Sequence, residues 1–418
     1  VCSFIAKKTL VEPLGRINFN KMTTLQEAYK TILNNTLPAK IISVPMAEAL
    51  GQVLAEPLYA DRDFPPYDRV TMDGIAICYK SFENGQRKFP IAGIAPAGAP
   101  KEELKDASHC LEVMTGAVLP NGTDTVIRYE DLEIEDGAAT IQPEQLRFQQ
   151  NIHGTGNDRS TGDLLVPPGK TIGPAEIGIA ATIGKSKLQI AQPPRTIVIS
   201  TGDELVEVDQ NPEAHQIRRS NVHTIIGALA QRGVPSDELH LTDDRPSLVL
   251  KLKEVLEKYE VLILSGGVSK GKYDYVPEVL EELGIEKSFH GVRQRPGKPF
   301  WFGANEKNVV FALPGNPVSS YMCTTRYIQP WFDKTLGLPE KNIPCAVLNN
   351  DFTFKPDLTY LLQVRLSYNS DGQILATPIE GGGSGDLANL GTVDAFLELP
   401  RGKILFKQGE VYPLFTFS

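Results

Sequence analysis

The chain has 418 residues, a formal net charge of −9 and a pI near 5.4. This length exceeds what one hydrophobic core usually supports, so we expect several domains in a soluble globular protein. The acidic balance argues against a nucleic-acid partner, and no apolar run approaches the ~20 residues of a membrane span. Five scattered cysteines with no Cys-x-x-Cys pair favour reduced thiols in a cytoplasmic protein.

The chain opens with a segment that carries no clear periodicity, and we interpret residues 1–21 as a leader of uncertain status. Thr24 and Glu27 then form a capping box, which predicts an amphipathic helix through residue 32. Residues 40–60 predict a strand, a helix over 46–54 and the start of another strand.

Between residues 73 and 168, short apolar runs are separated by Pro and Gly at intervals typical of a small β domain. A Pro-rich loop with three aspartates, residues 63–76, precedes these runs and suits either a functional loop or a solvated linker. The strands are predicted at residues 74–79, 88–94, 110–114, 124–129 and 139–141.

From residue 195 the pattern changes to alternating strands and helices, which predicts a parallel sheet with helices on both faces. Ligands of such sheets bind at the carboxyl ends of the strands. Three Gly-containing polar loops follow apolar strands and are expected at that edge: residues 200–205, 265–274 and 314–319.

The second of these loops joins a buried strand to a helix through Ser265, Gly266 and Gly267. Backbone N–H groups and a helix N-terminus at one place suit a phosphate, although the glycine spacing is not that of a Walker A loop. An ordinary tight βα turn is an equally good interpretation of this loop alone. Residues 293–301 form a basic loop that suits an oxyanion or is simply solvated.

After residue 339 the sequence returns to short strands, interrupted by a Gly-rich loop at residues 381–386. This pattern predicts a C-terminal β domain of ordinary size.

Six short motifs occur in order along the chain: Thr71-Met-Asp-Gly74, Met114-Thr-Gly116, Ser200-Thr-Gly-Asp-Glu-Leu205, Ser265-Gly-Gly-Val-Ser269, Pro296-Gly-Lys-Pro299 and Leu313-Pro-Gly-Asn-Pro-Val-Ser319. Together they resemble the molybdopterin molybdenumtransferase family, which includes bacterial MoeA and the E domain of gephyrin. The resemblance runs from Met22 to the C-terminus.

The resemblance implies a multidomain α/β plus β fold. It comprises a discontinuous N-terminal domain (22–60 and 160–192), an inserted β domain (61–159), a doubly wound α/β domain like the molybdopterin-adenylating proteins (193–338) and a C-terminal β-barrel-like domain (339–418). It also implies a homodimer that inserts molybdate into adenylylated molybdopterin, with Mg²⁺-dependent release of AMP. A separate molybdopterin adenylyltransferase would supply that substrate.

Carried over residue by residue, the resemblance implies three groups of site residues. The catalytic set comprises Asp73, Thr115, Asp158, Glu204, Asp243 and Asp274, with Glu204 and Asp274 as ligands of Mg²⁺. The substrate-binding set comprises Ser265, Gly266, Gly267, Ser269, Pro314, Gly315 and Pro317. The molybdate set comprises Arg295, Lys298, Arg365 and Ser384.

Two residues depart from the family's pattern, because Arg295 stands where Lys is more usual and Arg219 where Asp or Asn is usual. Either change is expected to alter affinity for the dianion or the pterin, yet the acidic set is intact. Alternatives to the enzyme are a peptide-binding scaffold and an inert molybdopterin-binding protein. The residues by themselves fit a nucleotide-sugar or phosphosugar enzyme.

Overall fold

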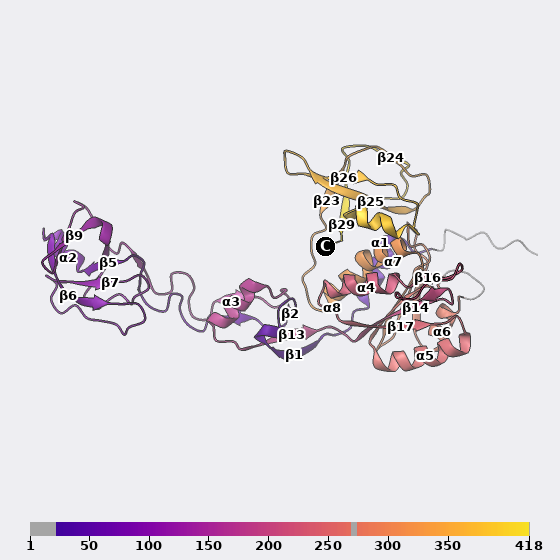
Figure 1. Cartoon of the computed structure of the whole chain (residues 1–418), viewed down its shortest axis with the longest axis horizontal. Coiled ribbons are helices and arrows are strands. Elements are labelled where there is room, and N and C mark those ends of the chain that lie inside the picture. Colours follow the sequence, from indigo (N-terminus) through magenta and orange to yellow (C-terminus); the bar gives the residue numbers. More distant parts are fainter. Residues whose placement is uncertain (1–21, 269–273, 418) are drawn as a thin grey trace, which may run out of the picture.

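The computed structural model describes residues 22–268 and 274–417. The predicted leader and Ser269 therefore lie outside the described residues. Figure 1 shows an elongated molecule with a β domain at one end, a small mixed domain in the middle, and an α/β domain and a barrel together at the other end. Within the described ranges, no helix is long and apolar enough to cross a membrane.

The α/β domain is built on a six-stranded sheet whose first four strands run parallel, as predicted. The fifth strand runs antiparallel to both of its neighbours. In spatial order the strands are β17 (Ser236–Leu241), β14 (Thr196–Thr201), β18 (Val261–Ser265), β22 (Val309–Leu313), β21 (Trp301–Ala304) and β19 (Glu286–His290).

Helices cover both faces of this sheet because its central strands are apolar on both sides. In β18, Val261 and Ile263 join one hydrophobic cluster, whereas Leu262 and Leu264 join another on the opposite face. The first cluster includes α4 (Asn221–Ala230) and α7 (Pro317–Cys323), and α7 continues through the π-helix η4 (Thr324–Ile328) into α8 (Gln329–Thr335). The second includes α5 (Arg245–Lys258) and α6 (Val276–Glu282). The predicted doubly wound architecture is thereby confirmed.

The first helix, α1 (Leu25–Asn34), begins with the predicted capping box of Thr24 and Glu27. The sequence groups it with the N-terminal domain, yet its apolar face is buried in the core of the α/β domain. The Trp331 indole N–H of α8 also donates to the Asn35 carbonyl at 2.9 Å.

The mixed domain is discontinuous in sequence, since β1 (Lys40–Pro45) pairs antiparallel with β13 (Lys187–Gln192), and β13 also pairs with β2 (Val53–Leu54). The helix α3 (Pro174–Thr182) packs in the same core. The helix expected over 46–54 is wrong, because only the 3₁₀ turn η2 (Met46–Glu48) forms there. Gly51, at φ +80°, interrupts the segment, and β2 then pairs with β13.

Two short antiparallel ladders lead into the inserted β domain. They are β3 (Leu58–Tyr59) with β12 (Leu164–Val166), and β4 (Arg69–Val70) with β11 (Ile152–His153). The domain itself carries one six-stranded sheet and the helix α2 (Tyr79–Glu83). In spatial order its strands are β8 (Thr125–Arg128), β5 (Gly74–Ile77), β7 (Cys110–Val113), β6 (Lys88–Ala95), β10 (Ala138–Ile141) and β9 (Leu132–Glu135).

The C-terminal domain is a closed five-stranded barrel, because its first strand also pairs with its last. The ring runs through β25 (Thr359–Tyr368), β26 (Ile374–Pro378), β23 (Cys345–Leu348), β29 (Val411–Thr416) and β27 (Ala395–Leu399). The strand β20 (Gln294–Arg295) of the preceding domain adds to β25, and β24 (Phe352–Thr353) pairs with β28 (Leu405–Phe406). A buried ion pair between Arg326 and Glu398, at 2.8 Å, joins the barrel to η4.

Candidate active site

Three of the predicted loops leave the sheet at the same edge. The parallel strands β14, β18 and β22 are in register, so that Ser200 lies beside Ser265 and Ser265 lies beside Leu313. The loops that follow these strands therefore start next to one another, as expected at the carboxyl edge of a parallel sheet. We call the three loops together the rim.

The turn at Gly266 and Gly267 packs tightly on the end of β14. Both glycines have positive φ, +106° and +65°, and a Cβ on Gly266 would lie 2.6 Å from the Thr201 carbonyl oxygen. The Gly266 N–H donates to the Leu313 carbonyl at 3.1 Å, so this N–H fixes the loop and is not available to a phosphate. The assignment of Gly266 to the substrate-binding set stays a prediction.

A hydroxyl beneath this turn has no hydrogen-bond partner within the described part of the chain. It is the Thr201 Oγ1, which is buried and which a Cβ on Gly266 or Gly267 would approach to 2.7 or 3.0 Å. Buried hydroxyls are usually hydrogen-bonded, so an unsatisfied hydroxyl here is unusual and places a polar group directly beneath the rim.

One amide joins two of the rim loops. Asn221 is the first residue of α4, and its Nδ2 donates to the Ser265 Oγ at 2.9 Å and to the Gly315 carbonyl at 2.7 Å. Gly315 and Gly266 also lie close, since a Cβ on Gly315 would be 3.8 Å from the Gly266 Cα. Sequence reasoning did not single out Asn221, whose role depends on contacts between distant segments.

Carboxylates gather beside the first rim loop. Burial raises the pKa of the half-buried Asp243 carboxyl, and the negative charges of Asp203 and Glu204 act in the same direction. Asp274 adds to this effect on the Asp243 pKa, more weakly. The predicted residues Glu204, Asp243 and Asp274 therefore face a common region of excess negative charge, together with Asp203, which the sequence analysis had not singled out.

The third rim loop contacts the barrel. The Asn316 Nδ2 donates to the Ser384 Oγ at 2.8 Å, and the Val318 N–H donates to the Ser384 carbonyl at 3.1 Å. These bonds place one residue of the predicted molybdate set directly against the Pro314–Pro317 segment.

The other residues of the molybdate set lie on or near the barrel's first strand. Arg295, in β20, is paired in register with Tyr360 of β25, and its guanidinium lies 5.9 Å from the Phe354 ring centroid. Arg365, also on β25, is exposed and donates twice to the Thr392 carbonyl, at 3.2 and 3.0 Å. Lys298 follows β20, and its carbonyl accepts from the Val292 N–H.

Three predicted catalytic residues do not reach the rim within one chain. Asp73 and Thr115 belong to the inserted β domain, at the far end of the molecule in Figure 1, and Asp158 lies on the segment that returns from it. The Thr115 backbone N–H donates to Asp73 at 2.6 Å, and this bond and the Thr115 hydroxyl lower the Asp73 pKa. Asp158 contacts the His153 ring nitrogen at 2.9 Å.

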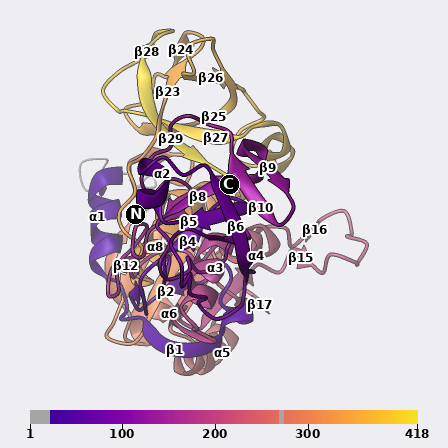
Figure 2. The ribbon, with the colours of Figure 1, turned by 90° about the vertical axis from the view of Figure 1, so that its left-hand side faces the viewer.

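Arg219, one of the two departures from the family's pattern, is buried and already paired. Its guanidinium contacts Glu207 at 2.5 Å and Glu238 at 3.5 Å, and lies 3.4 Å from the Ser200 Oγ. These ion pairs therefore stabilise the base of the arm formed by β15 (Leu205–Val206) and β16 (Ile217–Arg218), which projects from the body in Figure 2.

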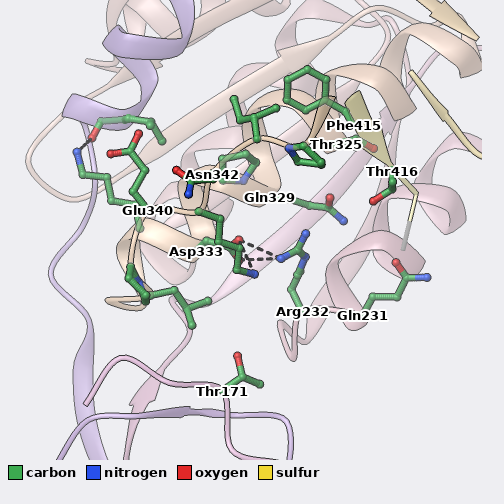
Figure 3. Close-up of a pocket in the computed structure, with 18 of the residues that line it drawn as sticks. Thr171, Gln231, Arg232, Thr325, Gln329, Asp333, Glu340, Asn342, Phe415 and Thr416 are labelled. Carbon is green, nitrogen blue, oxygen red and sulfur yellow. Dashed lines mark hydrogen bonds and ion pairs between the residues drawn. The ribbon is translucent and has the colours of Figure 1, made fainter. Parts of the chain in front are cut away.

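A separate cavity of about 910 Å³ lies where α1, α8, the barrel and the mixed domain meet. An ion pair between Arg232 and Asp333 forms part of its wall (Figure 3). None of the predicted site residues lines this cavity. The sequence offered no signal for it, because its walls come from segments that lie far apart in the chain.

Comparison with known proteins covers nearly the whole chain. Residues 23–184 match the MoeA N-terminal region (domain I and II), residues 197–334 a probable molybdopterin binding domain, and residues 345–415 the MoeA C-terminal region (domain IV).

Individual relatives match over similar lengths. A molybdopterin molybdenumtransferase of Synechocystis sp. is 42% identical over 88% of this chain and 93% of its own length. One of Staphylococcus aureus is 31% identical over 92% and 93%. The crystal structure of a molybdopterin biosynthesis MoeA protein from Pyrococcus horikosii superimposes with a TM-score of 0.82 at 27% identity, covering 95% of this chain and all of that one. The chain therefore belongs to the molybdopterin molybdenumtransferase (MoeA) family.

Proposed function

We propose that this chain, an enzyme of molybdenum cofactor biosynthesis, inserts molybdate into adenylylated molybdopterin and releases AMP with the help of Mg²⁺. The observation that carries the proposal is the meeting of the acidic residues around Asp243 with the Gly266–Gly267 turn at one sheet edge. A phosphate-bearing substrate and a hard cation need these two features side by side.

The donor set at the rim fits Mg²⁺. Magnesium binds oxygen ligands and usually takes one or two carboxylates together with waters and substrate phosphates. Glu204 and Asp274 are the carboxylates that we assign to it. The ion would polarise the phosphate that is cleaved.

The chain's own residues then bind and orient the two substrates. Ser265, held by Asn221, and the Gly267 N–H are proposed to contact the phosphate. Molybdate is a tetrahedral dianion and needs donors, which Arg295, Lys298, Arg365 and Ser384 are proposed to supply. The Pro314–Pro317 segment sets the distance between the two subsites, because it bonds to both Asn221 and Ser384.

A second copy of the chain is proposed to complete the site. The inserted β domain, which carries Asp73 and Thr115, lies at the opposite end of the elongated molecule from the rim (Figure 1), so a homodimer in which each inserted domain reaches the partner's rim would bring the acidic set together. A molybdopterin adenylyltransferase is the proposed source of the adenylylated substrate.

The first test is a single-turnover assay with adenylylated molybdopterin, Mg²⁺ and molybdate, in which AMP is followed by chromatography. We expect AMP release that depends on molybdate, and we expect Glu204→Ala and Asp274→Ala to abolish it without unfolding the protein. Glu254→Ala, on the exposed face of α5, is the matched control and should be fully active. Full activity of both rim variants would refute the metal assignment, and a bound pterin that stays adenylylated would indicate a binding protein.

A mixing experiment tests the shared site. Asp73→Ala and Glu204→Ala are each expected to be inactive. After random subunit exchange, about half of the dimers carry one subunit of each variant, and each such dimer has one intact site. The mixture should therefore recover about a quarter of the wild-type activity. No recovery after verified subunit exchange would show that the two residues serve the same chain.

A further inference from the structure

Asn316 occupies the position before the first residue of α7, and its side chain does not serve that helix. Its backbone is extended (φ −72°, ψ 128°), as in a helix N-cap, but its side chain makes no capping bond. Asn is favoured at this position because its oxygen accepts from the first-turn N–H groups. Here the Asn316 side chain does not stabilise its own helix in this way, and it makes a different hydrogen bond.

The bond that Asn316 makes crosses to the barrel. Its Nδ2 donates to the Ser384 Oγ at 2.8 Å, while the Val318 N–H in the first turn of α7 donates to the Ser384 carbonyl at 3.1 Å. The barrel loop thus takes up one of the donors that a helix N-terminus leaves unsatisfied, and it does so through its backbone. The position of the loop is fixed by Val318, so the Asn316 amide acts on the hydroxyl alone.

The donor and acceptor roles in this bond determine what Ser384 offers to a ligand. An amide nitrogen only donates, so the Ser384 Oγ is the acceptor, and no residue that the structure describes accepts its own proton. A tetrahedral oxyanion only accepts, and it therefore needs that proton. We propose that Asn316 is a positioning residue that presents the Ser384 hydroxyl as a donor to molybdate, an inference that rests on the proposed molybdate subsite.

The loop should keep its shape when Asn316 is changed. Asp386 holds it from within, because its carboxylate accepts from the Gly382 N–H at 2.8 Å and from the Asn389 N–H at 3.3 Å. The Val318 bond to the Ser384 carbonyl is a backbone bond and also remains. Variants at Asn316 are therefore expected to fold as the wild type does.

The test compares Asn316→Ala, Asn316→Asp, Ser384→Ala and the double variant Asn316→Ala/Ser384→Ala. KM values for molybdate and pterin are measured by AMP release, and binding of molybdate alone is measured by equilibrium dialysis. Asn316→Ala should raise the KM for molybdate about tenfold, the size of a lost hydrogen bond to a charged group, and leave the KM for the pterin unchanged. Asn316→Asp should have the larger effect, because a carboxylate accepts the Ser384 proton itself and repels the dianion. Asn369→Ala, at the far turn of the same barrel, is the amide control.

The double variant shows whether Asn316 acts through Ser384 or independently of it. If Asn316 acts through Ser384, Asn316→Ala adds nothing in the Ser384→Ala background. A full additional effect in that background, or a wild-type KM for Asn316→Asp, would overturn the inference while the subsite stands. A wild-type molybdate KM and affinity for Ser384→Ala would overturn the subsite and the inference with it.

Discussion

Replacing Gly266 by Ala should distort the rim more than it destabilises the domain. The new methyl group would lie 2.6 Å from the Thr201 carbonyl oxygen, a backbone atom at the end of β14, and ordinary contact begins at 3.4 Å. Backbone atoms of a central strand move little, so the turn itself must shift by several tenths of an ångström. The positive φ costs about 1–2 kcal/mol for Ala, and the overpacking about 1–3 kcal/mol more.

Gly284→Ala provides the matched control. Gly284 follows α6 in the same domain and has φ +86°, but no atom lies within 4 Å of a Cβ there. The Gly284→Ala variant therefore has the strain of the positive φ, about 1–2 kcal/mol, without a steric clash. The chain's two tryptophans, Trp301 and Trp331, are both buried in this domain, so their fluorescence during urea unfolding reports on the domain alone.

The two variants should differ most in activity. A displacement approaching 1 Å at a reacting centre lowers the rate on the order of 10²-fold, so Gly266→Ala should lose AMP release by about that factor while Gly284→Ala keeps it. Equal losses of stability together with full activity of Gly266→Ala would refute the assignment of this turn to the substrate site.

Two further variants concern the barrel. Glu398→Gln leaves the buried Arg326 without its counter-charge and should lower stability by about 3–5 kcal/mol, whereas the double change to Leu at 398 and Met at 326 should recover most of that loss in thermal unfolding. If the double variant is no better than the single one, the ion pair is not the cause. The pKa of Glu410 is lowered to about 2, chiefly by its hydrogen bond from Lys403, so its stabilising effect is present above the unfolded-state pKa and is lost as the pH falls through about 2. NMR titration of the Glu410 carboxyl should show this low pKa, and Lys403→Met should raise it; an unshifted pKa in that variant would contradict the cause.

Local sequence patterns were sufficient where the structure depends on neighbouring residues. The capping box at Thr24, the apolar strand at residues 261–264 and the closely spaced strands of the barrel were all found from propensity and periodicity. The three rim loops followed from one rule about parallel sheets, because each comes directly after a buried strand.

Contacts between distant segments were beyond sequence reasoning. Nothing in residues 25–34 indicates that their apolar face packs on α8, and 296 positions separate Asn35 from Trp331. The Asn316 motif was recognised, but its bond to Ser384 depends on how the barrel sits on α7. The strands β19 and β21 were missed for different reasons. β19 lies at the edge of the sheet and exposes most of its residues, whereas β21 is buried between β22 and β19 but is only four residues long.

The paired ladders that lead into the inserted β domain have a consequence for engineering. The two passes of the chain are already hydrogen-bonded to each other at the neck, where the Ala60 N–H donates to the Asp163 carbonyl at 2.9 Å and the Gly162 N–H to the Ala60 carbonyl at 2.8 Å. The outgoing and returning strands therefore lie within the reach of a tight turn. A two-residue Asn-Gly link across this neck would excise the whole domain and leave a hairpin in its place, which makes the insertion a transplantable cassette.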